Sequence, residues 1–129
     1  MAEAKLSTKR TGWLGESAVV CDLISKGMDV YLPVVDDNLC DLVVDTGKNI
    51  KRVQVKSRVA IKRGTSVEVK CHKYKGSSID VIAIHYITNN MIAYVPYKDQ
   101  DSLNLAVSPA KNNQEMNRDW FYRYMEFPI

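Results

Sequence analysis

Three polar residues in the first half of the chain have side chains suited to phosphodiester hydrolysis: Asp41, Gln54 and Lys56. A carboxylate is an oxygen ligand of the kind that Mg²⁺ prefers, and the amide oxygen of Gln54 could add another. A lysine ammonium can orient an attacking water or stabilise the negative charge that develops on the phosphorus oxygens. The three residues therefore allow a metal-dependent nuclease centre. The competing interpretation is a strand face that simply carries polar side chains into water.

A predicted β-hairpin brings these residues together. Its turn is Gly47-Lys48, because Gly is favoured at the first position of a two-residue type II′ turn. Counting outward from this turn places Asp41 opposite Gln54, and opposed residues share one face of a sheet, as does Lys56 two residues further along. The other face collects the apolar residues of both strands, which are Leu42, Val44, Val53 and Val55. A one-residue slip would mix the two sets, so the pattern supports this register.

An amphipathic helix is predicted over residues 11–26, with Thr11 as its cap and Gly27 at its end. Its apolar stripe consists of Trp13, Val20, Leu23 and Ile24. Glu16 follows the first of these residues at helical spacing and is expected to point toward the sheet. A carboxylate there could be a second metal ligand. The alternative is an acid in the first helical turn, where the helix dipole favours it.

Short runs rich in β-branched residues follow the helix, with turn signals between neighbours. The expected strands are MDVYLPV, CDLVVD, IKRVQVKS, TSVEVKC, IDVIAIHYI and MIAYVPY. The tail from Asp99 onward starts polar, could form a short helix after Pro109, and ends in aromatic residues that could close the core or make a subunit contact. This order predicts an α/β fold with a central mixed sheet flanked by helices on both sides.

Length and composition predict one folded domain. A chain of 129 residues with 46% hydrophobic and 26% charged residues fits one globular unit over residues 1–129, with a core at about 11–97 and a tail at 98–129. We expect a soluble cytoplasmic protein with no membrane partner, because no apolar run approaches the ~20 residues of a membrane span and the N-terminus lacks a signal-peptide core. The three cysteines form no CxxC pair, so we expect three buried thiols and neither a disulfide framework nor a zinc site.

Basic residues are concentrated after the hairpin, although the net charge is only +3. The run IKRVQVKSRVAIKRG contains no acid, and VKCHKYKG adds further lysines. A block of this kind fits a polyanionic partner such as DNA, whereas a solvated charged face is the alternative. The residues expected to contact nucleic acid are Arg52, Arg58, Lys62, Arg63, Lys70, Lys73 and Lys75.

Other polar residues are expected to have structural roles. Asp36 and Asp37 are expected to form a turn before the strand CDLVVD. Asp80 is expected to cap or pair near the start of the strand IDVIAIHYI. Neither of the two histidines, His72 and His85, has a Cys or His at zinc-ligand spacing. An exposed strand position is expected for Glu68.

The stretch GWLGESAVVCDLISKGMDVYLPVVDDNLCDLVVDTGKNIKRVQVKS resembles the core of the PD-(D/E)XK nuclease superfamily. It is most similar to the branch of group I intron-encoded homing endonucleases, and next to the archaeal-type Holliday junction resolvases. The resemblance is close over residues 12–58 and looser over the later segment IDVIAIHYITNNMIAYVPY. It implies a restriction-endonuclease-like αβββαβ core.

The resemblance also implies a set of site residues. Glu16 matches the helical glutamate, Asp41 the motif aspartate, and Gln54-Val55-Lys56 the (D/E)XK element. The implied metal ligands are Glu16, Asp41 and the carbonyl oxygen of Val55, with Mg²⁺ as the expected ion and Mn²⁺ as its substitute. Two positions depart from the pattern. Gln54 replaces the usual second acid and so reduces the negative charge at the metal, and Cys40 stands where the superfamily name has proline.

Two classes of function follow. The first is a metal-dependent DNA endonuclease, with site-specific homing-type cutting of duplex DNA as the main expectation and Holliday junction resolution as the alternative. The second is a non-catalytic DNA-binding module of nuclease descent, which Gln54 favours, whereas retention of Glu16, Asp41 and Lys56 favours catalysis. Because one chain has one such centre, cutting both strands would require a homodimer or homotetramer.

Overall fold

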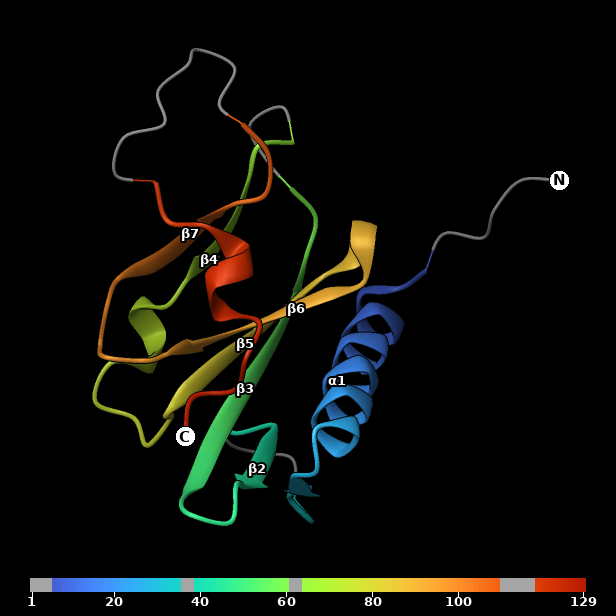
Figure 1. The fold of residues 1–129 in the computed structure, drawn as a ribbon, viewed down its shortest axis with the longest axis vertical. Coiled ribbons are helices and arrows are strands. Elements are labelled where there is room, and N and C mark those ends of the chain that lie inside the picture. Colours follow the sequence, from blue (N-terminus) through green and yellow to red (C-terminus); the bar gives the residue numbers. More distant parts are fainter. Residues whose placement is uncertain (1–5, 36–38, 61–63, 110–117) are drawn as a thin grey trace, which may run out of the picture.

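A mixed five-stranded sheet lies at the centre of the fold (Figure 1). The computed structural model describes residues 6–35, 39–60, 64–109 and 118–129. The strands lie in the order β1-β2-β3-β5-β6, with bounds Asp29–Tyr31, Leu42–Asp45, Ile50–Arg58, Val81–Tyr86 and Met91–Pro96. Strands β3 and β5 are parallel, and the other neighbouring pairs of this sheet are antiparallel. The predicted α/β class with a central mixed sheet is confirmed.

The hairpin of β2 and β3 has the predicted register. Val43 pairs with Arg52, which is the alignment obtained by counting outward from the turn. In the turn, the Thr46 amide donates to the Asn49 carbonyl at 2.9 Å. Gly47 has a φ of 87°, a conformation that glycine adopts at little cost. The turn residues and the apolar alternation therefore specify the same pairing.

Helix α1, Thr8–Ser25, lies along one face of the sheet (Figure 1). It begins earlier than predicted, because Ser7 and not Thr11 is the N-cap: the Ser7 hydroxyl accepts a hydrogen bond from the Arg10 amide at 3.2 Å. Its C-terminal end agrees with the prediction, since Gly27 follows the helix with a φ of 83°.

The buried stripe of α1 differs from the predicted one. Leu23 is buried as predicted, together with Gly15 and Val19, whereas Trp13 and Ile24 are 58% and 59% exposed. The prediction followed the largest apolar side chains, but Gly15 is the residue at which the helix approaches β3 most closely. The helix-facing core contains Leu42, Val44, Val53, Val55, Val81, Ala83, Ile92 and Tyr94.

The opposite face of the sheet is covered by a second, two-stranded antiparallel sheet. It consists of β4, Ser66–Lys70, and β7, Ser102–Ala106. Two short 3-10 helices, η1 (His72–Tyr74) and η3 (Phe121–Tyr124), complete this layer, and a third, η2 (Ile87–Asn89), connects β5 to β6. The core on this side includes Val67, Val69, Ile82, Ile84, Ala93, Val95, Leu103 and Leu105.

Two details of this layer correct the prediction. In the described part of the chain, strands and 3-10 turns cover the face on which a second helix was expected; the helix proposed after Pro109 falls largely on residues 110–117, outside the described residues. Strand β7 was not predicted, although Leu103 and Leu105 alternate there with polar residues at strand spacing. The alternating apolar side chains of β4 and β7 bury this face without a helix.

The aromatic tail closes both cores. Phe121 packs beside Tyr86 in the core under β4 and β7, with ring centroids 6.0 Å apart. Phe127 packs beside Tyr94 in the core under α1, with ring centroids 5.3 Å apart. Of the two roles left open for these aromatics, core closure is the one that the two phenylalanines fulfil, whereas Tyr122 is 63% exposed.

No helix in the described ranges has the length and apolar character needed to cross a membrane.

All three cysteines are free thiols. Cys71 is buried, Cys40 is half-buried and Cys21 is exposed, so the prediction of three buried cysteines was wrong for Cys21, which lies on the solvent side of α1.

A polar network ties the end of α1 to β6 and to the tail. The Tyr94 hydroxyl donates to the Asp22 carboxylate at 2.5 Å, and Lys26 lies 3.2 Å from the same carboxylate. The Lys26 ammonium also donates to the Met125 carbonyl at 2.6 Å and lies over the Tyr94 ring. Burial, followed by the hydrogen bond to Asp22, raises the pKa of Tyr94 well above its ordinary value.

Tyr94→Phe is expected to lower the free energy of unfolding by about 1–3 kcal/mol, because it removes a buried hydrogen bond to a carboxylate. The folded state keeps the Tyr94 proton above pH 10, where an unfolded tyrosine loses it. The contribution of Tyr94 to the free energy of unfolding is therefore fully present below pH ~10 and is lost as pH rises further. Urea unfolding between pH 8 and 11 measures both effects, and the loss of stability with pH should be shallower in the variant.

Tyr122→Phe is the matched control, since it removes a hydroxyl from an exposed ring. Equal stability of Tyr94→Phe and Tyr122→Phe at pH 8 would contradict the assigned role of the Asp22 hydrogen bond.

Candidate functional site

The carboxylate of Asp41 is attached to the backbone of β3. Asp41 immediately precedes β2, and its amide donates to the Val53 carbonyl at 2.9 Å, so the hairpin pairing extends to this residue. Its Oδ2 accepts a hydrogen bond from the Val55 amide at 2.8 Å. The side chain thus occupies the place of a backbone acceptor, which fixes the carboxylate relative to the strand.

Gln54 and Lys56 lie beside this carboxylate on the face of β3 that points away from α1. Their neighbours Val53 and Val55 belong to the core under the helix, and alternate residues of a strand point to opposite faces. The Gln54 amide nitrogen donates to the Val55 carbonyl at 3.4 Å. The predicted grouping of Asp41, Gln54 and Lys56 on one side of the hairpin is therefore present.

Lys56 is half-buried, and this lowers its pKa. Burial is the main cause, and the positive charge of Arg58 lowers the pKa further. The negative charge of Asp41 opposes both effects, so the carboxylate lies near enough to act on the ammonium. A partly desolvated ammonium attracts an anion more strongly than a fully hydrated lysine does, because less water screens the attraction.

Glu16 approaches from the helical layer. It follows Gly15, the point at which α1 lies against β3: a Cβ placed on Gly15 would be only 2.0 Å from the Ser57 hydroxyl oxygen. Glu16 is half-buried and thus lies at the margin of the helix–sheet contact. The structure places it on the α1 side of β3, whereas Lys56 projects from the other side.

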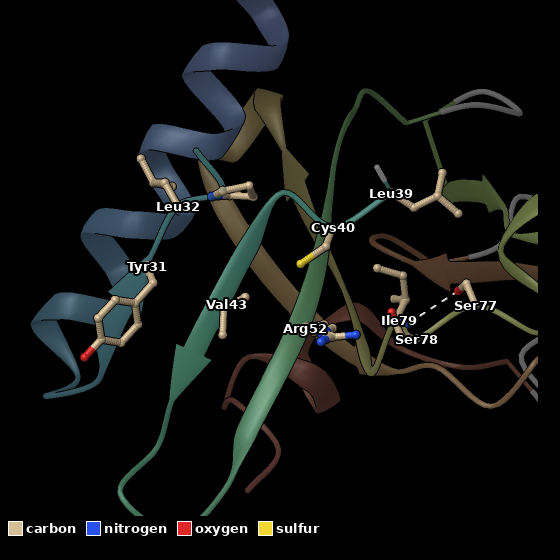
Figure 2. A pocket seen from close by; sticks show the side chains of 10 residues that line it. Tyr31, Leu32, Leu39, Cys40, Val43, Arg52, Ser77, Ser78 and Ile79 are labelled. Atoms are coloured by element: carbon tan, nitrogen blue, oxygen red, sulfur yellow. Dashed lines mark hydrogen bonds between the residues drawn. The ribbon is translucent and has the colours of Figure 1, made fainter. Parts of the chain in front are cut away.

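A hollow of about 570 Å³ lies on the same face as Asp41, Gln54 and Lys56. Figure 2 shows Val43 and Arg52 on the paired strands, with Cys40 beside them and Ser77 and Ile79 across the hollow. Its other lining residues are Tyr31, Leu32, Pro33, Leu39 and Ser78. Cys40 precedes Asp41 in the chain, but Asp41, Gln54 and Lys56 are not among the residues that line the hollow.

The strand segment next to this hollow is fixed by Asp80. The Arg52 amide donates to the Asp80 carboxylate at 2.8 Å, and the Asp80 amide donates to the Arg52 carbonyl at 2.9 Å. The expectation that Asp80 pairs near the start of its strand is confirmed.

The predicted nucleic-acid contacts have different surroundings. Arg58 donates to the carbonyls of Glu68 and Ser57 at 3.3 and 2.9 Å, so it links β3 to β4. Lys70 is exposed at the end of β4, and Lys75 forms an ion pair with Asp101. Arg52 lines the hollow, Lys73 lies over the ring of Tyr74, and Lys62 and Arg63 lie outside the described residues.

The histidines do not form a metal site. His72 is exposed, 3.7 Å from the Asp101 carboxylate, and His85 is buried with Nε2 2.7 Å from the Asn90 side-chain oxygen. Within the described ranges, no three His, Cys, Asp or Glu side chains lie together as a metal cluster. Glu68 is half-buried in β4 and not exposed as predicted, and the turn expected at Asp36 and Asp37 lies outside the described residues.

A hard divalent cation fits the donor chemistry at the start of β2. Asp41 offers a carboxylate held in place by a backbone amide, and Val55 offers a carbonyl oxygen on the adjoining strand. Mg²⁺ is usually held by only one or two carboxylates and retains waters, so it does not require a three-acid cluster.

Two features of the site were missed in the sequence. Gly15 is the contact point of α1 with β3, and a glycine next to a glutamate inside a helix was the available signal. Tyr74 lies under the ammonium groups of Lys56 and Lys73. No sequence signal indicated Tyr74, because the contact joins two elements far apart in the chain.

Gly15→Ala is expected to lower the free energy of unfolding by about 1–3 kcal/mol, because the new methyl group overlaps the Ser57 hydroxyl. Adding Ser57→Ala should restore stability, since the next nearest atom is then Ser57 Cβ at an ordinary 3.4 Å. Chemical denaturation of both variants measures the effect.

Gly12→Ala serves as the control. Nothing lies within 4 Å of a Cβ there, so the variant should gain up to about 1 kcal/mol from helix propensity. A Gly15→Ala protein that matches Gly12→Ala in stability would disprove the close helix–strand contact.

The chain matches one protein family and is similar to two solved structures. A family model described as PD-(D/E)XK endonuclease matches residues 6–127. Among solved structures, the chain is similar to the bacterial homing endonuclease I-Ssp6803I, with a TM-score of 0.73 and 20% identity over 93% of this chain and 87% of that one. It is also similar to Hjc, a Holliday junction resolvase of Archaeoglobus fulgidus, with a TM-score of 0.49 and 14% identity over 74% of this chain and 84% of that one.

No curated protein sequence matches the chain. At 20% identity, the likeness to the homing endonuclease establishes the fold, which is the restriction-endonuclease-like fold predicted from the sequence. The family model covers nearly the whole chain, and the protein therefore belongs to the PD-(D/E)XK endonuclease family.

Proposed function

We propose that this protein is a divalent-metal-dependent DNA endonuclease that cuts duplex DNA at specific sites, as a homing endonuclease does. Its family membership supports endonuclease chemistry, and the homing endonuclease I-Ssp6803I shares its fold over most of both chains. The main supporting observation is the Asp41 carboxylate, which is fixed to the Val55 amide beside Lys56 on one face of β3.

Each site residue has a proposed role. Asp41 and the Val55 carbonyl oxygen would hold the cation directly, for which Mg²⁺ is the expected ion and Mn²⁺ a substitute. Glu16, which lies on the α1 side of β3, would hold it through one of the waters that Mg²⁺ retains. Gln54 would position the Val55 carbonyl, to which its amide nitrogen already donates at 3.4 Å. Lys56 would bind a non-bridging phosphate oxygen or orient the attacking water. A bound divalent cation would supply an activated water and offset charge on the phosphoryl oxygens.

Because the Lys56 ammonium is partly removed from water, it is suited to bind a phosphate oxygen. An ammonium that is partly removed from water loses less solvation when it binds a phosphate oxygen, and its attraction to the oxygen is screened less. Asp41 keeps the lysine close to the cation site, since opposite charges favour that arrangement. The same strand would therefore position the groups that hold the metal and the group that stabilises the phosphate.

Two copies of the chain are required to cut both strands of a duplex. One chain offers one carboxylate–lysine centre, and a homodimer or homotetramer would place two centres on the two strands with a spacing set by the subunit symmetry. The target would then be symmetric or nearly so.

Asp41→Asn and Lys56→Gln are each expected to reduce cleavage by at least about 100-fold. The first substitution keeps an acceptor for the Val55 amide and removes only the charge, so the fold should be retained. The assay uses supercoiled plasmid, intron-lacking genomic DNA and a synthetic four-way junction, each with Mg²⁺ and with EDTA. DNA binding measured in Ca²⁺ should survive both substitutions.

Asp80→Asn is the matched control, because its carboxylate also accepts a backbone amide of β3 at 2.8 Å but does so at Arg52, three residues before Val55. Discrete duplex fragments support the proposal, whereas symmetric nicks in the junction alone would point to a resolvase. DNA binding without any metal-dependent cleavage would indicate a non-catalytic module, for which the amide of Gln54 in place of an acid is the supporting feature.

Lys70→Gln should weaken DNA binding and reduce the slope of log K against log salt by about 0.9, the value for one lost phosphate contact. Lys70 is exposed at the end of β4, which packs against Ile84, the partner of Lys56 in the sheet. Fluorescence anisotropy at several salt concentrations measures the slope. Lys9→Gln on α1, on the opposite layer, should leave it unchanged, and equal slopes for both variants would argue against this surface.

A further inference from the structure

Tyr74 is a rigidly held aromatic ring beside the proposed site. It ends η1 and is fully buried. Its ring makes an edge contact with Tyr97 at a centroid distance of 6.2 Å, and the Tyr97 hydroxyl donates to the Cys71 carbonyl at 3.2 Å. The Tyr74 amide donates to the same carbonyl at 2.9 Å. Backbone and side-chain contacts therefore fix where the face of this ring points.

Two lysines from different elements meet at this ring. The Lys56 ammonium lies 5.5 Å from the ring centroid and the Lys73 ammonium lies 5.3 Å from it. Both distances are within the ~6 Å at which the negative face of an aromatic ring attracts a cation. Lys56 comes from β3 and Lys73 from η1, so Tyr74 brings together charges that are distant in sequence.

The neighbouring basic residues are directed elsewhere. Lys75 forms an ion pair with Asp101, and His72 lies 3.7 Å from the same carboxylate. Lys73 thus differs from both neighbours in contacting the ring over which Lys56 lies. The side chains of Lys56 and Lys73 also interact with each other. An anion that binds both would therefore pair with each ammonium and offset the repulsion between them.

The ring of Tyr74 is the part that both lysines contact, whereas its hydroxyl interacts with Lys73. The hydroxyl is enclosed and has no well-formed hydrogen bond to the described residues. Burial raises the pKa of the hydroxyl, and both the charge of Lys73 and its side-chain interaction with the hydroxyl oppose this without reversing it. The group therefore stays protonated and uncharged near neutral pH, and the face of the ring is what both lysines contact.

We propose that Tyr74 positions Lys56 and Lys73 as a two-lysine binding site for one phosphate group of the DNA backbone. This inference rests on the proposed function for the source of that phosphate. The Asp41 carboxylate accepts the Val55 amide at 2.8 Å, and Lys56 is the next residue of β3, so the bound phosphate is at or next to the cleaved one. Lys56 and Lys73 contact its oxygens, and Tyr74 is a positioning residue that acts through them.

The first test is spectroscopic and needs neither DNA nor metal. Protons over an aromatic ring are shifted upfield, so the Cε methylene signals of Lys56 and Lys73 should both be shifted in the NMR spectrum. Tyr74→Phe should keep these shifts, because it removes only the hydroxyl, and Tyr74→Leu should abolish them. Unshifted signals in the wild-type protein would overturn the arrangement.

The second test is functional. Tyr74→Phe should cleave within about twofold of the wild type, whereas Tyr74→Leu should lose roughly tenfold, in line with the strength of a partly buried cation–π contact. Lys73→Gln should weaken duplex binding in Ca²⁺ and reduce the salt slope by about 0.9. Lys9→Gln, an exposed lysine on the opposite layer, is the control. Wild-type cleavage by Tyr74→Leu, or a Lys73→Gln slope equal to that of the control, would overturn the proposal.

A third measurement separates this inference from the proposed function. Inorganic phosphate is titrated into metal-free protein while the Lys56 and Lys73 signals are followed. One outcome is that both signals respond to phosphate in the wild type and not in Tyr74→Leu while the protein neither binds nor cuts DNA. In that case the two-lysine site stands and the proposed function as a DNA endonuclease fails. If neither signal responds to phosphate or to duplex DNA, the two-lysine site is wrong.

Discussion

The hydrogen bond between the Val55 amide and the Asp41 carboxylate is the constraint on which the site depends. It is 2.8 Å long and joins a side chain at the start of β2 to the middle of β3. A carboxylate that replaces a backbone acceptor in a sheet cannot turn away without leaving an amide unpaired, which costs about 1–3 kcal/mol. The strand thereby fixes both the acid and, one residue further along, Lys56. The site is stiff because the sheet itself holds it.

The sheet can hold a polar site on one face because different layers cover its two faces. Helix α1 buries one side of β2 and β3, while the second sheet covers β5 and β6 on the other side. This leaves the second face of β2 and β3 with half-buried polar residues and the hollow beside Arg52. The intermediate burial lowers the pKa of Lys56 without enclosing it. A helix across this face would have replaced the polar residues with a core.

The local features of the fold were predictable, and the long-range ones were not. The hairpin register followed from Gly47-Lys48 and an alternation of period two, because both act between residues close in sequence. The stripe of α1 was misassigned because burial of Gly15 depends on its contact with Ser57, which residue size and helical spacing do not reveal. Strand β7 was not predicted because the tail begins with polar residues, although Leu103 and Leu105 alternate there. The strand that pairs with it, β4, lies far away in the chain. The same limit applies to the site: the hairpin placed Asp41, Gln54 and Lys56 together, but the Tyr74 contact joins separate elements.

The division of the aromatic tail between the two cores has a consequence for synthesis. Phe121 completes the core under the second sheet, and Phe127 completes the core under α1. A nascent chain that has not yet extended past Phe127 lacks an aromatic residue from at least one layer that supports β2 and β3. Since domains generally fold as units, the core under α1 is complete only when Phe127 is present, and Phe127 follows Lys56 by 71 positions in the chain. The sheet that holds Asp41 and Lys56 is therefore supported by a residue that is synthesised after both of them.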